Sequence, residues 1–376
     1  MLEAPTTSPR TAATAVTPVH LKFIGKNTFQ VELRKRIDAY FVQTGRRKRD
    51  CWQMYLKSAI LLSSFFGLYA LLVFFAPAWW LAVPVAVALG LVTAGIGMNV
   101  QHDGSHHAYS DRPWINRLSA MTLEMIGGSS YLWHYQHGVF HHTYTNITGH
   151  DGDVDVGIFG RLTPHQKRLP FHRWQHLYMW LLYGLVAIRW HLWGDLSDIL
   201  SGKSGEHPIP RPRGWNLIQF VAGKIVFLSL AFVIPMIFHP WWVVLLFYAL
   251  IAVVVGIVLT VVFQLAHAVE GAEFTIPDGD SGKIDNAWAI HQAESTVDFA
   301  RGNRLAAYLL GGLNYQIEHH LFPRICHINY PALSTIVEQT CRDFGVKYNE
   351  HRTFSAGVRS HYRWLRYLGR AEPQGV

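Results

Sequence analysis

The sequence predicts an all-α integral membrane protein, with four transmembrane helices in two hairpins and a helical cap domain on the cytoplasmic side. Three observations predict this fold. Half of the 376 residues are hydrophobic and 15% are charged, against roughly 25% charged residues in ordinary globular chains. Four apolar stretches are long enough to cross a bilayer. Histidines are strongly clustered, because residues 21–101 contain none and residues 102–150 contain eight of the 22.

Each apolar stretch approaches the roughly 20 residues that a membrane helix needs. Only two residues separate the members of each pair, Pro77-Ala78 in the first and His239-Pro240 in the second. Proline disfavours continuation of a helix, so each pair is predicted to form a tight hairpin. The four predicted spans are residues 58–76, 79–100, 217–238 and 241–263.

The distribution of Lys and Arg predicts the orientation. Ten precede the first span, ten lie between the hairpins and eleven follow the last span, whereas the hairpin turns carry none. Basic residues favour the cytoplasmic side of a membrane. We therefore expect a multi-pass protein with both termini and its polar body in the cytoplasm, in the inner (plasma) membrane if the source is bacterial.

Three segments are predicted along the chain. Residues 1–50 are a flexible tail and a cytoplasmic N-terminal segment without the apolar core of a cleavable signal peptide. Residues 51–350 form the membrane domain, and residues 351–376 form a C-terminal cytoplasmic tail. A further apolar run, residues 177–188, is too short to span a bilayer. It is interpreted equally well as a helix on the inner membrane interface or as a buried helix of the cytoplasmic domain.

Histidines form three clusters that all follow the spans on the same side of the membrane. Pairs at i and i+4 share one face of a helix. Buried imidazoles that converge need low pKa values or a metal ion. Their number exceeds the three or four ligands of a zinc site and favours a binuclear centre, although imidazole suits iron, copper and zinc alike. The clusters are His102, His106 and His107; His134, His137, His141 and His142; and Gln316, His319 and His320, with His267 just after the fourth span.

Several carboxylates lie beside or within these clusters. Asp151, Asp153 and Asp155 resemble a calcium loop, but the glycine and the closing glutamate of such a loop are missing. We expect them to orient ligand imidazoles, rather than to form a solvated acidic turn. Asp103 and Glu318 are expected to act in the same way. Six other histidines are predicted to be surface or interfacial residues: His150, His165, His172, His176, His191 and His207.

The spacing of these residues resembles that of the membrane fatty acid desaturases, in particular the front-end and bacterial acyl-lipid or linoleoyl-CoA branch. The boxes are His102-x3-His106, His137-x3-His141-His142 and Gln316-x2-His319-His320. The flanking words match as well: His-His-Thr-Tyr-Thr-Asn at 141–146, Gln-Leu-Ala-His at 264–267 and Asn-Tyr-Gln-Ile-Glu-His-His-Leu-Phe-Pro at 314–323. The resemblance covers about residues 50–350.

The resemblance implies a non-haem centre of two iron ions held by histidine in the cap. Gln316 stands where many members have histidine, so it is expected to be a weak ligand or a neighbour of the metal. His134 and His291 are placed with Gln316 as residues next to the ligands. Gly138 departs from the asparagine that is frequent after the first histidine of the second box. The implied ligands are His102, His106, His137, His141, His142, His267, His319 and His320, with His107 as an alternative in the first box.

The implied activity is O2-dependent introduction of a cis double bond into a fatty acyl chain, carried by coenzyme A or by a membrane lipid. No catalytic residue beyond the metal ligands is expected. The chain has neither a His-Pro-Gly-Gly haem motif nor a Gly-x-Gly-x-x-Gly motif. Electrons would therefore come from a separate donor, either ferredoxin or cytochrome b5 with its reductase. Nothing suggests a nucleic-acid partner.

Three alternatives stay open at this point. A hydroxylase, acetylenase, ketolase or sphingolipid desaturase would use the same diiron scaffold. A membrane zinc hydrolase is expected to carry His-Glu-x-x-His, which is absent from the sequence. A non-catalytic metal-binding or transport protein is expected to place ionisable residues inside the spans, whereas the histidine clusters here lie outside them.

Overall fold

The computed structural model describes residues 21–75, 78–278 and 281–372. Four of its helices are long and apolar enough to cross a membrane: Trp52–Phe74, Trp79–Ser105, Trp215–Phe238 and Trp241–His267. These helices confirm four candidate spans near the predicted positions. Their arrangement in a bilayer as two hairpins under a cytoplasmic cap stays a prediction. The predicted flexible tail at 1–18 and the residue Pro77 lie outside the described residues.

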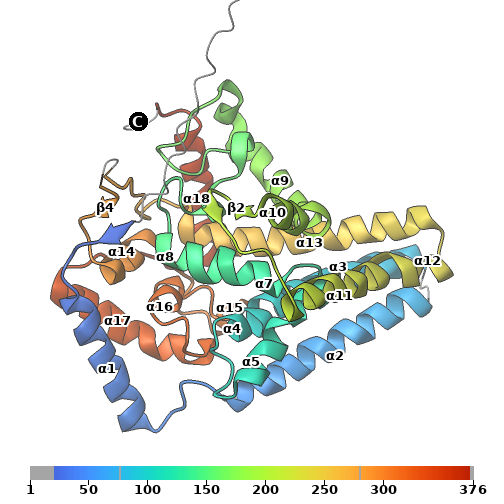
Figure 1. Ribbon diagram of the computed structural model, residues 1–376, viewed down its shortest axis with the longest axis horizontal. Coiled ribbons are helices and arrows are strands. Elements are labelled where there is room, and N and C mark those ends of the chain that lie inside the picture. The colour runs from blue at the N-terminus through green and yellow to red at the C-terminus, as the bar shows by residue number, and fades with distance from the viewer. Residues whose placement is uncertain (1–20, 76–77, 279–280, 373–376) are drawn as a thin grey trace, which may run out of the picture.

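The spans are built from consecutive helical elements. Figure 1 shows α2 beside α3, and α11 with α12 beside α13, as elongated rods on the right. Two of the rods contain π-helical turns, η1 and η7. The elements are α2 (Trp52–Phe74), α3 (Trp79–Ile96), η1 (Gly97–Gln101), α4 (His102–Ser105), α11 (Trp215–Leu228), η7 (Ser229–Val233), α12 (Ile234–Phe238) and α13 (Trp241–His267).

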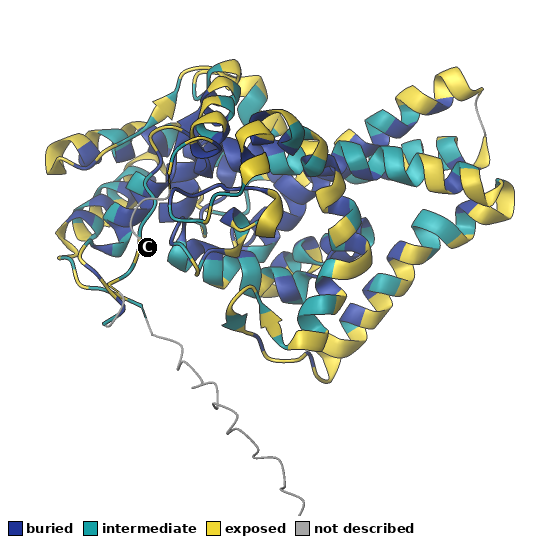
Figure 2. Cartoon of the chain, turned by 90° about the horizontal axis from the view of Figure 1, so that it is seen from above, coloured by how far each residue is buried: buried dark blue, intermediate teal, exposed yellow. Residues whose placement is uncertain are grey.

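The remaining elements form a mainly helical body at one end of the spans. Figure 2 shows that dark blue, buried residues concentrate where this body meets the spans. The helices are α1 (Thr28–Thr44), α5 (Pro113–Ala120), α6 (Thr122–Ile126), α7 (Ser130–Trp133), η2 (His134–His141), α8 (His142–Tyr144), η3 (Gly152–Val154), η4 (Gly157–Phe159), η5 (Pro170–Trp174), α9 (Gln175–Arg189), η6 (Trp190–Gly194), α10 (Asp195–Ser201), α14 (Trp288–Ser295), α15 (Arg304–Leu309), α16 (Gln316–Leu321), η8 (His327–Asn329), α17 (Tyr330–Phe344) and α18 (Phe354–Leu368).

The described residues contain six strands of two residues each, of which two pairs join distant parts of this body and the third is a local hairpin. Strand β1 (Lys22–Phe23) runs parallel to β4 (Lys283–Ile284). The antiparallel pair is β2 (Lys203–Ser204) with β3 (His207–Pro208). Strand β5 (Asp298–Phe299) is parallel to β6 (Glu350–His351). Each pair fixes a loop near the helices that carry the histidines.

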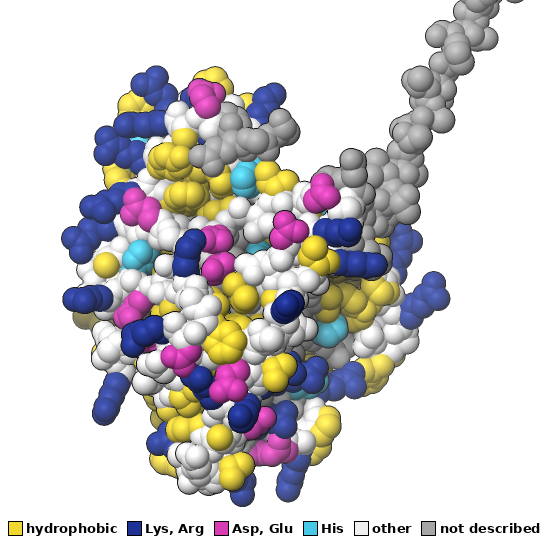
Figure 3. All heavy atoms as spheres, turned by 90° about the vertical axis from the view of Figure 1, so that its left-hand side faces the viewer, with side chains coloured by type: hydrophobic (Ala, Val, Ile, Leu, Met, Phe, Trp, Pro, Cys, Tyr) yellow, Lys and Arg dark blue, Asp and Glu magenta, His cyan; other side chains and the backbone are white. Residues whose placement is uncertain are grey.

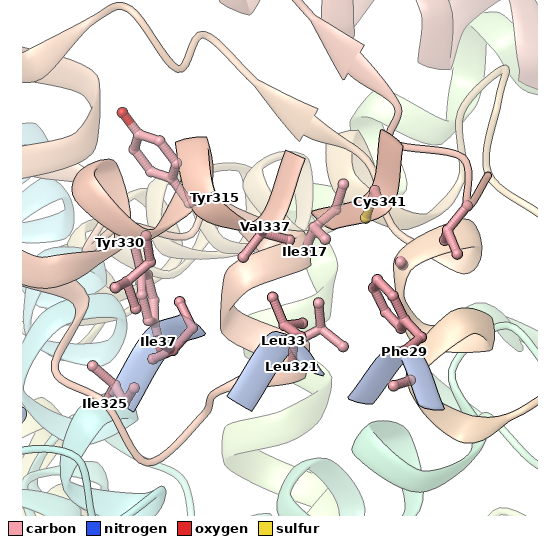
Figure 4. Close-up of a cluster of buried hydrophobic side chains, with 14 of the residues drawn as sticks. Phe29, Leu33, Ile37, Tyr315, Ile317, Leu321, Ile325, Tyr330, Val337 and Cys341 are labelled. Carbon is pink, nitrogen blue, oxygen red and sulfur yellow. The ribbon is translucent and has the colours of Figure 1, made fainter. Parts of the chain in front are cut away.

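Helix α1 closes the body beside the third histidine cluster. Phe29, Leu33 and Ile37 recur every four residues and are buried, as expected for one apolar face of a helix. Figure 4 shows these side chains packed against Ile317 and Val337 of α16 and α17. At the other end of the chain, α18 buries Leu365 in the cluster that also contains residues of α9 and α13. Both terminal segments therefore contribute helices to the folded body.

Helix α9 contains the short apolar run 177–188, for which the sequence left two interpretations open. One face packs closely on α13, because a Cβ at Gly256 would stand 2.6 Å from the carbonyl oxygen of Tyr183. Only glycine allows the two backbones to approach in this way. The opposite face exposes Leu177, Leu181 and Leu185. The helix is therefore buried on one side and exposes leucines on the other, as an interfacial helix does.

Candidate metal centre

The first group of histidine side chains forms where the second span leaves the apolar bundle. The π-helical turn η1 leads α3 directly into α4, which begins with His102. Nε2 of His102 lies 3.1 Å from Nε2 of His137, and the ring centroids of His102 and His106 are 4.8 Å apart. His102, His106, His137 and His319 each place a nitrogen atom within 4.8 Å of the others. Three segments of the chain, the first box at α4, the π-helix η2 and α16, thus contribute to one group.

A second group lies beside the first and combines His141, His267 and His320. His267 is the last residue of α13, so the fourth span carries it rigidly into the group. Nε2 of Gln316 lies 3.0 Å from Nε2 of His267 and 3.3 Å from Nε2 of His320. A half-turn of the amide presents its oxygen to the same nitrogens. Gln316 therefore occupies the position of an additional ligand in this group.

His142 connects the two groups. It offers a nitrogen atom within 4.8 Å of those of His319 and His320, and its Nε2 lies 3.4 Å from Nε2 of His137. The second box begins in the π-helix η2, and its last residue, His142, is the first residue of α8. π-Helical turns occur frequently at functional sites. Here the wide turns bring both His137 and His141 to the buried side.

The donor atoms in the cluster fit a bound metal. Nε2 of His106, His141 and His319 is buried and has no hydrogen-bond partner among the described residues. Burial, followed by the neighbouring imidazoles, lowers the pKa of most of these rings. Neutral imidazoles present lone pairs, which are the form that binds metal. Outside the candidate spans, the rings of the cluster whose pKa lies well below the ordinary value are His106, His137, His142, His319 and His320.

Two of the carboxylates that were predicted to orient histidines lie near the cluster. Asp151 contacts His141, and Asp103 approaches His102. Both carboxylate oxygens of Asp151 lie 3.1 Å from Nδ1 of His141. Burial lowers the pKa of His141, but Asp151 and then Asp153 raise it above the ordinary value. The ring therefore donates Nδ1–H to Asp151 and turns Nε2 into the cluster. Oδ1 of Asp103 lies 4.0 Å from Nδ1 of His102. The Asp151 contact is typical of a carboxylate that orients a metal-binding histidine, whereas the distance from Asp103 to His102 is too long for a hydrogen bond.

The other three predicted carboxylates differ from one another. Asp153 reaches the cluster, with Oδ2 3.5 Å from Nδ1 of His141. Asp155 is exposed and accepts a hydrogen bond from the backbone N–H of Gly157 in its own loop. Glu318 turns away from the histidines and accepts from the Tyr348 hydroxyl at 3.0 Å. The expectation that Asp155 and Glu318 orient ligand imidazoles therefore has no support in these contacts.

The remaining predicted residues lie outside the two groups. His107 is exposed with a positive φ of 57°, and among the described residues it joins neither group. His134 is exposed at the start of η2. The sequence places His134 next to the ligands of the second cluster, and the chain is π-helical there. His291 is buried and its Nε2 lies 2.8 Å from the carbonyl oxygen of Thr145, so it supports the loop after the second box.

Several neighbours of the cluster were missed by sequence reasoning. Nδ1 of His320 lies 2.8 Å from Oε1 of Gln292 and 3.1 Å from the Thr145 hydroxyl. His327 joins Asp103 to Lys57, with 3.0 Å from its Nδ1 to Asp103 and 3.0 Å from its Nε2 to Nζ of Lys57. Gln292 directly follows His291 in the sequence, and this adjacency is the one local signal that could have pointed to Gln292 as a neighbour of the cluster. The other contacts join segments far apart in the chain.

Three histidines that were expected at the surface or interface are buried instead. His172 donates its Nε2–H to the carbonyl oxygen of Ile158 at 2.8 Å. His176 packs its ring against Tyr362, and His191 packs against Phe227. Each lies between helices whose packing the local sequence does not reveal.

An apolar cavity of about 280 Å³ lies between the candidate spans. His191 and Ile126 line it near the histidine end, and Trp79 and His239 line it near the other end. Trp190, next to His191, lies 5.7 Å from the Trp133 ring, and Trp133 stacks on His137 at 4.5 Å between centroids. Two indole rings thus separate the cavity wall from the histidine cluster.

Comparison with known proteins identifies the family. Residues 77–352 match the family model described as fatty acid desaturase. The chain is 38% identical over 357 residues to an sn-1 linoleoyl-lipid 6-desaturase of Synechocystis sp., covering 95% of this chain and 99% of that protein. It is 37% identical to a protein of the same name from Arthrospira platensis, covering 90% and 92%.

A third relative, an acyl-lipid (8-3)-desaturase of Physcomitrium patens, is 32% identical over 92% of this chain and 72% of its own length. The chain belongs to the fatty acid desaturase family. It is accordingly an oxidoreductase that acts on fatty acyl chains, and the branch expected from Gln316 is confirmed by these relatives.

Proposed function

We propose that the protein introduces a cis double bond into a fatty acyl chain carried by a membrane lipid, on the carboxyl side of an existing double bond. The observation that carries the proposal is the convergence of eight buried imidazoles in two adjacent groups. The names of the two cyanobacterial relatives support a lipid-bound linoleoyl chain and position 6.

The cluster is proposed to hold two iron ions. His102, His106, His137 and His319 would hold one, and His141, His267 and His320, with Gln316 beside them, would hold the other. His142 would serve at the junction of the two groups. The bound irons supply the activation of dioxygen that removal of hydrogen from an unactivated methylene requires, because no side chain is a strong enough oxidant.

The residues around the cluster supply orientation and shielding. Asp151 holds the His141 ring by its Nδ1–H, and Gln292 holds the His320 ring in the same way. Asp103 faces His102 and is itself held by His327. The eight rings are all buried, so bulk water is excluded from the space that they enclose. These contacts keep the Nε2 atoms directed inward before any ligand binds.

The cap and the active site are proposed to face the cytoplasm, together with both termini. The spans would form two hairpins, α2 with α3 and α11–α12 with α13. The desaturase unit is placed in residues 51–350, with α1 and α18 packed onto it. Figure 3 shows Lys and Arg side chains spread over the end of the molecule that lies away from the far ends of the spans, in line with the positive-inside rule.

The apolar cavity supports a membrane-embedded substrate. It is lined mainly by residues of the four spans, and its volume is near the lower end of small-molecule pockets, about 300–1,000 Å³. We place the methyl-terminal part of the acyl chain there, with the reacting carbons beyond Trp133 and Trp190. The chain would reach this position laterally from the bilayer.

Electrons for each turnover are proposed to come from a separate protein, ferredoxin or cytochrome b5 with its reductase. The sequence contains no haem-binding or dinucleotide-binding motif of its own. A donor supplied in the test host is therefore a requirement of any activity assay.

The proposal is tested by expressing the wild type beside a His319→Ala, His320→Ala variant in a host with a compatible donor and supplied linoleate. Fatty acids are derivatised to locate double bonds and analysed by mass spectrometry. The expected product is two mass units lighter than linoleate, is found in the lipid fraction and appears only with the wild type. A product sixteen units heavier would assign the protein as a hydroxylase instead.

A further inference from the structure

Helix α18 presents a row of arginines on its exposed face. Arg359, Arg363 and Arg366 lie on α18 at intervals of four and three residues, and Arg370 follows in the turn after the last helical residue, Leu368; all four are exposed. Residues three and four apart lie on one face of a helix. The opposite face carries the buried Leu365 and Leu368. The row is therefore a continuous basic surface on a helix that is firmly packed.

The arginine row leads to the N-terminal end of α9. A Cβ at Gly369 would stand 2.2 Å from the carbonyl oxygen of His172, so the end of α18 touches the segment just before α9. The surface is hollowed between Arg363, Arg366 and Arg370. Next to this hollow, the Arg173 guanidinium lies over the Trp174 ring at 5.1 Å.

An exposed apolar stripe begins at the same place and continues along α9 and α10. Large exposed apolar surfaces on a folded protein mark contacts with a partner or a membrane. Helix α9 itself packs on α13, one of the candidate spans. Its members are Trp174, Leu177, Leu181, Leu185, Leu192, Trp193, Leu196 and Leu200.

We infer that the arginine row of α18 binds anionic phospholipid headgroups of the leaflet that covers the apolar stripe of α9 and α10. Guanidinium groups match phosphate oxygens in geometry and charge, and anionic lipids attract basic residues beside a membrane. Carboxylates neutralise the row only slightly. The one ion pair that the described residues give these arginines is the 3.9 Å contact between Arg363 and Glu270.

An acidic protein would match the charge of the row but not the leucines beside it. A lipid surface matches both, because headgroups and acyl chains are adjacent in a leaflet. The inference concerns membrane contact and is independent of the reaction at the histidine cluster.

The test uses the full-length protein in detergent supplemented with phosphatidylglycerol or phosphatidylcholine, and native mass spectrometry counts the retained lipids. The test variant is Arg363→Gln, Arg366→Gln, Arg370→Gln. The matched control, Arg34→Gln, Lys35→Gln, Arg342→Gln, removes the same charge from exposed positions on α1 and α17. The test variant is expected to retain phosphatidylglycerol about fivefold less well per removed charge, while the control behaves as wild type and phosphatidylcholine retention is unchanged.

Equal retention by the test variant and the wild type overturns the inference, as does an equal loss in the control. The inference is also overturned if inorganic phosphate, at the same concentration as phosphatidylglycerol, displaces the lipid. The hollow between the arginines would then be a binding site for a soluble anion. If the test variant retains lipid like the wild type but needs more ferredoxin to reach the same activity, the inference is overturned and the arginine row is assigned to binding of the electron-donor protein. If the triple variant melts at a lower temperature than the wild type, the single Arg366→Gln variant is compared in the same assay.

Discussion

His327 lies with its Nδ1 3.0 Å from Oδ2 of Asp103, the residue directly after the candidate ligand His102. The backbone N–H of His327 donates to the same oxygen at 3.2 Å. On its other side, Nε2 of His327 accepts from the ammonium of Lys57 at 3.0 Å. All three side chains are buried. A cation at the inner end of the first span is thus linked through His327 to the carboxylate that faces His102.

Replacing Lys57 by methionine is expected to weaken iron binding about tenfold, the lower end of the effect of losing a partner of a metal ligand. Without the ammonium, Asp103 lacks a compensating positive charge and holds His102 less firmly. Iron retained per folded chain during titration with a chelator measures the effect. Lys224→Met removes a half-buried lysine of another span, whose ammonium pairs with Asp195 at 2.9 Å. The Lys57 contribution is refuted if both variants retain iron equally.

Gln316 is expected to contribute directly to the second group. Gln316→Ala removes the amide that faces His267 and His320, so iron content should fall toward one ion per chain. Gln316→His places an imidazole in the same position and should retain both ions. Elemental analysis of the purified variants distinguishes the two outcomes. Full iron content in Gln316→Ala would show that the amide only fills space.

Asp151→Asn should lower iron affinity about 10–100-fold. Asparagine has one acceptor oxygen where Asp151 has two, which also accept from the backbone N–H groups of Asn146 and Asp153. The His141 ring also loses the negative charge that raises its pKa. Asp155→Asn is a matched control in the same loop, because Asp155 is exposed and bonds only within its own turn. Chelator titration of both variants measures the difference. Equal iron affinities of the two variants would show that Asp151 does not support metal binding.

Glu318 gives a pH-dependent prediction. Burial and then the neighbouring Asp298 raise the pKa of Glu318 well above its ordinary value. The folded protein therefore keeps a proton that the unfolded chain releases, and stability is lost as the pH rises through the raised pKa. Glu318→Gln removes this loss, so its melting temperature should fall less than that of the wild type between about pH 6 and pH 9.

The control for this prediction is Glu206→Gln, at an exposed position. It should follow the wild type across the whole range. A Glu318→Gln profile parallel to that of the wild type would mean that Glu318 is ionised in the folded protein.

The histidines that meet in the cluster could be predicted because they recur at short intervals beside recognisable spans. His102, His106, His137 and His141 each belong to a local pattern, and the spans fix where that pattern emerges. The contact of Glu318 with Tyr348 and the exposed position of His134 could not be predicted, for a physical reason. Spacing alone does not show which side chain turns toward a distant carboxyl such as Asp298, or that η2 is π-helical.

The supports of the cluster could not be predicted from local sequence. Lys57 and His327 are 270 positions apart, and Thr145 and His320 are 175 apart. Such contacts arise from the packing of helices and leave no periodic signal. The same holds for α18, whose buried face was not distinguished from a solvated tail.

The metal content of the purified wild-type protein tests the central claim most directly. The two groups of histidines predict two iron ions per chain, measured by elemental analysis against amino-acid quantification, and loss of both in the His319→Ala, His320→Ala variant. A single zinc ion per chain, or iron content unaffected by that variant, would contradict the account.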